Sequence, residues 1–200
     1  MLSPHFRFPA VLAAGAALGV AAPLAARVGG TPGHAAHLVL SAGWAWAALA
    51  FCAGLLHESR IRAAGTATAA LCVAVISYYL TKSQYGDFVT VDMSDASGAT
   101  TYFSYGELFS NMLMWLGPAC LFGPVLGIAG HAARRGGFRT LPALLLVPAV
   151  AVVESSMRLR TEASLQPPVA AATWTAVEWT AVAVMVCLAA WVATARRVPG

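Results

Sequence analysis

Two glutamates lie inside long apolar segments in the last third of this chain. Glu154 stands in VVESSMRLR and Glu178 in TWTAVEWTAV, and they are two of only eight acidic residues. A carboxylate within a membrane segment is energetically costly, so it usually faces the interior of the helix bundle or water. Because a desolvated carboxyl group can hold a proton for general acid–base chemistry, Glu154 and Glu178 are the candidate catalytic residues.

Arg158 is the expected partner of one of these acids. It follows Glu154 by four residues, which places both side chains on one face of a helix, and it could instead reach Glu178 on the next segment. Under one interpretation, an ion pair only fixes the register of the helices. Under the other, the acids share a polar cavity that opens to the outside, with one carboxyl protonated by desolvation.

Further polar and aromatic residues lie at a similar depth. With a rise of about 1.5 Å per residue, Glu178 lies about 13 Å and Glu154 about 9 Å below the outer surface. Trp174 and Trp179 either line the cavity or anchor their helix at the interface. The residues that we predict to bind a ligand are Tyr78, Tyr79, Glu107, Asn111, Arg158, Trp174 and Trp179.

The same residues fit one enzymatic alternative. A protonated acid in an aromatic-lined apolar pocket can start the carbocation cyclisation of an isoprenoid, with Tyr78, Tyr79, Trp174 and Trp179 stabilising the cation. The sequence contains no H-E-x-x-H, G-x-S-x-G or P-loop motif and no Cys/His metal spacing. We therefore predict no metal and no cofactor.

The composition indicates where these residues must lie. Of the 200 residues, 59% are hydrophobic and 10% are charged, whereas a soluble domain has about 45–50% apolar and about 25% charged residues. The formal net charge of +4 comes from short basic clusters between apolar runs, which indicates membrane orientation and not nucleic-acid binding. The expected partners are the lipid bilayer and a lipophilic small molecule.

Six apolar segments are long enough, or nearly so, to cross a hydrocarbon core about 30 Å thick. They predict a single all-α domain over residues 1–200, built as a six-helix transmembrane bundle. The first segment alternatively fits a cleaved signal peptide. The helices are expected over about 8–26, 37–56, 61–80, 108–130, 141–159 and 169–192.

The basic residues predict that both termini are cytoplasmic, since the inner side then carries eight of them and the outer side four. An alanine-rich chain with a single lysine, Lys82, indicates a bacterial source and hence the bacterial cytoplasmic membrane. The inner residues are Arg7, Arg60, Arg62, Arg134, Arg135, Arg139, Arg196 and Arg197, and the outer ones are Arg27, Lys82, Arg158 and Arg160.

An outer loop over residues 81–106 separates the third and fourth segments. In FVTVDMSDASGATTYFSYG, β-branched and aromatic residues flank a turn-like run at 94–98. The pattern predicts either a short β-hairpin or a disordered polar loop. A hairpin is marginally stable by itself in water, so it would need to dock on the helix ends.

Glycines four residues apart offer surfaces for close helix packing. Gly15 and Gly19 lie in the first segment, and Gly123 and Gly127 lie in the fourth. Because lipid provides no hydrophobic drive between helices, small residues that admit close backbone approach help to hold them together. We expect packing within the chain, and an oligomer formed through the same faces is the alternative.

Several of these motifs together resemble a known group of proteins. The runs LSAGWAWAALAFCAGLL, GPVLGIAGHAARRGG, VVES and AVEWTAVAV are similar to small bacterial multi-pass membrane proteins with a domain of unknown function. The likeness extends over the second to sixth segments and implies a fold but no activity. The residues that carry it are Ser41, Trp44, Gly123, Gly127, Glu154 and Glu178.

These observations lead to three expectations of function. The first is an integral membrane protein with a polar cavity on its outer side for a small molecule or lipid. The second is a membrane-bound enzyme that protonates and cyclises an isoprenoid-type substrate. The third is a structural or accessory subunit whose buried polar groups serve only assembly. The first expectation requires that both buried acids point inward at one level.

Overall fold

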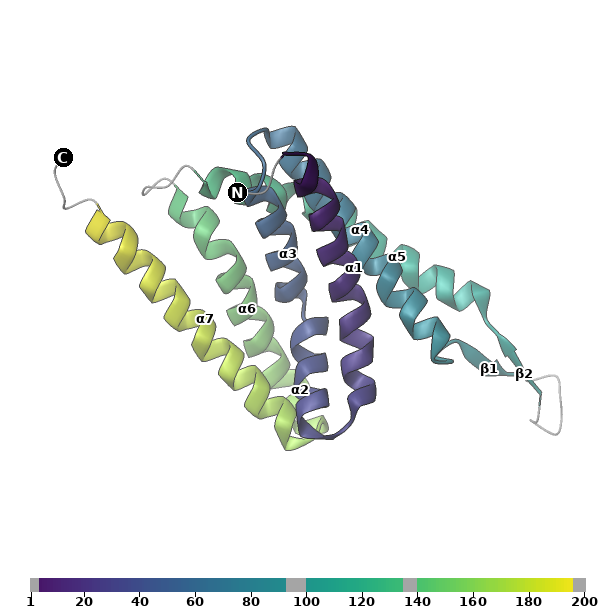
Figure 1. The fold of residues 1–200 in the computed structure, drawn as a ribbon. Helices are drawn as coiled ribbons and strands as arrows, with labels where there is room; N and C mark the ends of the chain where they lie inside the picture. The colour runs from purple at the N-terminus through teal and green to yellow at the C-terminus, as the bar shows by residue number, and fades with distance from the viewer. Residues whose placement is uncertain (1–3, 93–99, 135–139, 196–200) are drawn as a thin grey trace.

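The protein is a bundle of long α-helices with one small β-hairpin (Figure 1). The structure is a computed structural model, and it describes residues 4–92, 100–134 and 140–195. In chain order the elements are α1 (Pro4–Val28), α2 (Gly30–Ser41), α3 (Gly43–Leu55), α4 (Arg60–Gln84), β1 (Val89–Val91), β2 (Thr101–Phe103), α5 (Tyr105–Ala133), α6 (Leu141–Thr161), the 3-10 turn η2 (Ala163–Leu165) and α7 (Pro168–Ala195).

Among the described residues, five helices are long and apolar enough to cross a membrane, namely α1, α4, α5, α6 and α7. The shorter helices α2 and α3 pass the same test only as a pair, and they are bent by 54° at the break between them. The described part of the chain therefore holds five candidate spans, or six if the bent pair is one span. This arrangement confirms a helical fold with several candidate membrane spans.

The second predicted segment is not the single helix that we expected over residues 37–56. The first half begins earlier, at Gly30, and ends at Ser41. Ala42 has an extended backbone with a ψ of 141°, and a new helix begins at Gly43. The sequence did not predict this break, because an apolar segment of the same composition can form either a straight or a broken helix. At the break, the first N–H groups of α3 bind a side chain of α6.

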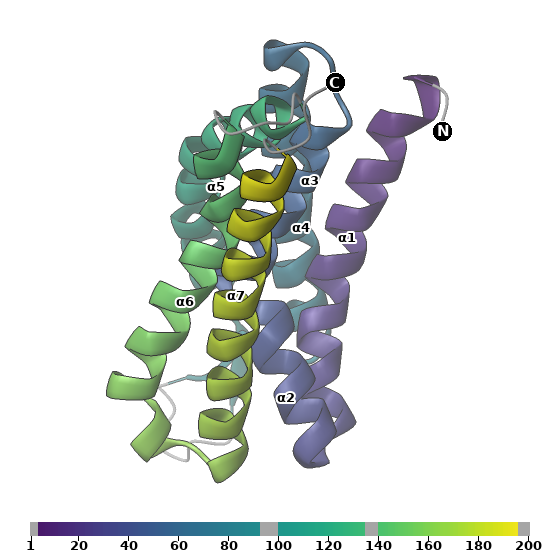
Figure 2. The same ribbon diagram turned by 90° about the vertical axis from the view of Figure 1, so that its left-hand side faces the viewer.

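The bundle has two distinct ends (Figures 1 and 2). One end, here called the terminal end, holds the start of α1, the end of α7 and the loop between α3 and α4. The opposite end, here called the hairpin end, holds the turn between α1 and α2, the β-hairpin and the connection between α6 and α7. Helix α4 packs against α1, α3 and α5, whereas α7 packs against α6 and α2.

Glycines on two neighbouring helices let α4 pack closely on both. A Cβ added to Gly15 of α1 would lie 2.5 Å from the carbonyl oxygen of Ala70. A Cβ added to Gly127 of α5 would lie 2.5 Å from the carbonyl oxygen of Ala63. Real Cβ atoms essentially never approach an oxygen so closely. These glycines therefore serve packing within the chain.

The segment between α4 and α5 forms the expected β-hairpin. Strands β1 and β2 pair antiparallel with Val89 opposite Phe103, while the predicted turn at 94–98 lies outside the described residues. The hairpin docks through Phe88, which is buried and whose ring centroid lies 6.2 Å from Tyr79 of α4 and 6.4 Å from Phe103. This aromatic contact provides the support that a two-stranded hairpin needs.

Replacing Gly127 by alanine should destabilise the bundle by about 1–3 kcal/mol, the usual cost of forcing an extra carbon into a packed core. The new Cβ would meet both the Ala63 carbonyl oxygen at 2.5 Å and the Ala67 Cβ at 2.8 Å. Thermal unfolding in detergent, followed by circular dichroism, measures the effect. Gly117→Ala on the same helix is the matched control, because no atom lies within 4 Å of its added Cβ. Equal melting temperatures for the two variants would contradict the packing argument.

Candidate functional site

The break between α2 and α3 leaves polar backbone groups inside an apolar bundle. The first N–H groups of any α-helix have no acceptor within that helix, and a lipid environment offers none either. The N-cap residue of α3 is Ala42, whose side chain makes no capping hydrogen bond. An acceptor must therefore come from another part of the chain.

Glu154 of α6 supplies that acceptor. Its Oε1 accepts a hydrogen bond from the backbone N–H of Gly43 at 3.0 Å, and its Oε2 accepts one from Trp44 at 3.0 Å. The carboxylate thus lies at the positive end of the α3 dipole, where a negative charge is stabilised. The Glu154 side chain is only 14% exposed, so this contact lies within the bundle.

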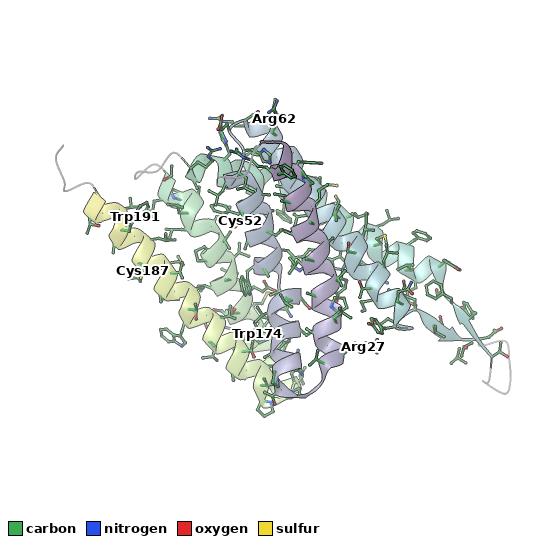
Figure 3. All side chains as sticks on the ribbon, in the orientation of Figure 1. Arg27, Cys52, Arg62, Trp174, Cys187 and Trp191 are labelled. Carbon is green, nitrogen blue, oxygen red and sulfur yellow. The ribbon has the colours of Figure 1, made fainter. Side chains whose placement is uncertain are left out.

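Arg158 completes a polar cluster around Glu154. Its Nε donates to Oε1 of Glu154 at 3.1 Å, and its Nη1 donates to Oε2 of Glu162 at 3.0 Å. Its guanidinium carbon lies 4.9 Å from the ring centroid of Trp174 on α7, whose side chain is fully buried. Of the two partners considered for Arg158, the structure thus has Glu154 and not Glu178. The position of Trp174 on α7, beside the break, is shown in Figure 3.

Glu178 lies in a different environment. Its Oε1 accepts a hydrogen bond from the hydroxyl of Ser156 on α6, and the side chain is half-buried. Ser156 follows Glu154 by two residues, and two residues correspond to about 200° around a helix. Glu154 and Ser156 therefore point to different sides of α6, and the two carboxylates bind different groups and have no hydrogen-bond partner in common among the described contacts.

The other predicted ligand-binding residues are spread over the bundle. Tyr78 and Tyr79 lie together on α4 with their ring centroids 5.3 Å apart, and Tyr79 belongs to the hydrophobic core. Asn111 donates to the backbone carbonyl of Glu107, whose side chain is exposed at the start of α5. Trp179 is 68% exposed on α7, which fits the lipid-facing anchor and not a cavity wall. Among these predicted residues, Arg158 contacts Glu154 directly, and Trp174 contacts Arg158.

The hairpin end contains a pocket of about 320 Å³ between α1, α2 and α4. Of the predicted ligand-binding residues, Tyr78 is in its lining. The pocket is lined by Pro23, Ala26, Arg27, His37, Tyr78, Lys82, Tyr85 and Asp87. Arg27 and Lys82 lie just after predicted segments and Asp87 lies in the predicted outer loop, and that shared outer level is the signal by which the sequence could have grouped them. His37 begins a predicted segment at the same level, but histidines at segment ends are usually solvated, so it did not stand out.

Two cations in this pocket share one carboxylate. Nη2 of Arg27 lies 2.6 Å from Oδ1 of Asp87, and Nζ of Lys82 lies 3.2 Å from Oδ2. Each cation also lies over an aromatic ring, Arg27 over Tyr85 at 4.9 Å and Lys82 over Tyr78 at 5.8 Å. The pocket thus combines a net positive charge with aromatic walls. Figure 3 shows Arg27 at the hairpin end of α1.

His37 connects the pocket to the helix break. Its Nδ1 lies 2.8 Å from the carbonyl oxygen of Ala22 on α1 and 3.1 Å from Oγ of Ser41. Ser41 is the last residue of α2, directly before the extended Ala42. The polar contacts of the pocket thus extend to the end of α2, and only Ala42 separates Ser41 from Gly43, which donates to Glu154.

The long apolar helices, the bent pair α2–α3 and the Glu154–Arg158 ion pair on α6 define the class as a helical protein with several candidate membrane spans and polar groups between its helices. The chain belongs to a family of unknown function, DUF6518, whose model matches residues 2–199. This membership confirms the resemblance to proteins with a domain of unknown function. No curated protein and no solved structure matches the chain.

Replacing Glu154 by glutamine should lower the free energy of unfolding by about 1.5–3 kcal/mol, the usual contribution of a hydrogen bond to a charged group. The amide keeps one oxygen, but its NH₂ group cannot accept a hydrogen bond from the second N–H of α3. Because the amide is uncharged, it also cannot form the ion pair with Arg158. Unfolding by denaturant in detergent micelles measures the loss.

Glu178→Gln is the matched control, because the amide oxygen still accepts the Ser156 hydroxyl. Its unfolding midpoint should stay close to that of the wild type. If both substitutions lowered stability equally, the cap on α3 would have no special role.

Proposed function

We propose that this protein binds a small molecule with an anionic group in the hairpin-end pocket, as a transport-related membrane protein. The observation that carries the proposal is the broken span α2–α3 beside that pocket. Transporters place broken helices at their binding sites, because the ends of half-helices supply dipoles and polar backbone groups within the membrane.

The contact between the pocket and the break supports this assignment. A ligand that touches His37 acts on Ser41, since the two side chains are in hydrogen-bonding contact. Movement of Ser41 shifts the start of α3 relative to Glu154, because only Ala42 separates the two half-helices. Occupancy of the pocket can thereby change the bend within the span.

The charges of the pocket favour an anionic or zwitterionic ligand. Arg27 and Lys82 supply two positive charges, while Asp87 supplies one negative charge that both of them share. A ligand carboxylate can replace Asp87 on Lys82, and the rings of Tyr78 and Tyr85 can cover the apolar part of the same ligand. The volume of about 320 Å³ is at the small end for ligand sites, so the ligand is small.

Binding is favoured over isoprenoid cyclisation because neither candidate acid, Glu154 or Glu178, is in the lining of the pocket that contains Tyr78. Glu178 of α7 contacts Ser156 of α6, whereas Tyr78 and Tyr79 project from α4. The third alternative, a structural subunit, is consistent with the cap that Glu154 forms on α3. It predicts that no ligand binds in the hairpin-end pocket, so the labelling of Lys82 distinguishes it from the binding function.

For the location, we propose the bacterial cytoplasmic membrane with both termini cytoplasmic, so that the hairpin-end pocket opens to the outside. The support is the excess of arginines at the terminal end, where Arg7, Arg60, Arg62 and Arg134 lie. An oligomer is compatible with this proposal. Since the glycines pack within the chain, it would use other helix faces.

Ligand binding should protect Lys82 from an amine-reactive reagent. Lys82 is the only lysine, so peptide mass spectrometry follows one side chain separately from the terminal amine. At about 100 Kd of ligand only about 1% of the pockets are free, so acylation should slow about a hundredfold. The probes are a panel of amino acids, short-chain organic acids and amines of matched size.

His37→Gln should weaken this protection, because His37 lines the pocket. His34→Gln, on the same helix but outside the lining, is the matched control and should protect like the wild type. The proposal fails if no anionic or zwitterionic compound in the panel slows labelling, which is the result that a purely structural subunit would give.

A further inference from the structure

A second and larger pocket lies at the terminal end, far from the hairpin. It has a volume of about 670 Å³ and is formed by the start of α1, the loop between α3 and α4, and the first turns of α4. It is lined by Arg7, Phe8, His57, Glu58, Ser59, Arg62, Gly65 and Thr66. We propose that this pocket binds a phosphate group, carried by an anionic lipid or by a soluble phosphate compound.

Three arginines from separate helices converge on one imidazole here. Burial lowers the pKa of His57, and the positive charges of Arg7, Arg62 and Arg134 lower it further. Arg7 comes from α1, Arg62 from α4 and Arg134 from the end of α5, so the fold brings together charges that are distant in sequence. Because like charges repel one another, an anion bound in the pocket beside Arg7 and Arg62 stabilises this cluster. Figure 3 shows Arg62 at this end of the bundle.

The one acid in the described lining of this pocket offsets its positive charge only weakly. Glu58 is the one acid in the lining, but its side chain is 80% exposed and its Oε1 lies 3.9 Å from Nη2 of Arg134. Exposed pairs of this kind contribute little. In the described ranges, no carboxylate lies within ion-pair distance of Arg62. Arg62 is therefore available to an external anion.

His57 adds a hydrogen-bonding group to the same pocket. Its backbone carbonyl lies 2.9 Å from Nδ1 of His131, a contact that holds the loop in place. Its Nε2 is buried and has no hydrogen-bond partner in the part of the chain that the structure describes. A buried polar atom without a partner is costly, and a phosphate oxygen that accepts from Nε2–H satisfies it. The hydroxyl of Ser59 offers a second donor in the lining.

The apolar residues at this end favour the lipid as the source of the phosphate. Phe8 is 48% exposed within the lining, and Ile61, next to Arg62, is 85% exposed. A lipid phosphodiester can bind the arginines while its glycerol and acyl chains lie against these side chains. Basic pockets between membrane helices recognise anionic headgroups in this way.

The test uses the full-length protein in neutral detergent, mixed with dioleoylphosphatidylglycerol or dioleoylphosphatidylcholine. Native mass spectrometry counts the lipids that stay bound, and the phosphatidylglycerol adduct should predominate. Arg62→Gln should weaken its binding at least about five-fold, the effect of one basic residue near a lipid surface. Arg60→Gln, two residues away but outside the lining, is the matched control and should bind like the wild type.

A second variant covers the case in which Arg62→Gln does not fold. His57→Ala leaves the backbone carbonyl that His131 contacts, and it removes a side-chain nitrogen that has no partner in the described structure. It should also weaken binding of phosphatidylglycerol.

Competition with inorganic phosphate and glycerol 1-phosphate then distinguishes the two sources. Bound phosphatidylglycerol that resists both compounds identifies the lipid as the ligand, and displacement by either of them identifies a soluble phosphate compound. Equal retention of the two lipids, or equal weakening by Arg60→Gln and Arg62→Gln, would overturn the proposal.

Discussion

The carboxylate of Glu154 at the start of α3 is the interaction on which the rest of the bundle depends. Two backbone N–H groups would otherwise lie unpaired at a helix break within the apolar interior, and neither lipid nor the side chain of Ala42 can accept them. Because the acceptor belongs to α6, the same contact ties the pair α6–α7 to the broken span. Arg158 balances the charge, and Trp174 covers the guanidinium from α7.

The polar and charged side chains described above thereby lie in three places, namely at the two ends of the bundle and at the break between α2 and α3. The helices α1, α4 and α5 meet through glycine and alanine, whose backbones approach too closely to leave space between them. The two pockets described above lie beside the hairpin and beside the loop between α3 and α4. Each pocket gathers cations from different helices, so each is suited to an anion. In the hairpin-end pocket, Asp87 already supplies part of the negative charge.

Sequence reasoning placed part of the candidate site correctly. The spacing of Glu154 and Arg158 allowed an ion pair within one helix, and that pair is present. The same reasoning expected Glu178 to share the site, but the direction of a side chain around a helix depends on which neighbours surround it. Arg27, His37, Lys82 and Asp87 were not grouped, since they come from three segments that only the tertiary structure brings to one pocket.

The sequence by itself determined that the chain forms long apolar helices, and it allowed a hairpin between α4 and α5. The length of an apolar segment and the alternation of residues in a strand can both be read from consecutive residues, because the cost of exposing a residue to water depends mainly on that residue and its element. Only the tertiary structure decided that one span is broken and which acid caps it. Glu154 and Gly43 are 111 positions apart, and a bond over that distance exists only after the helices have packed.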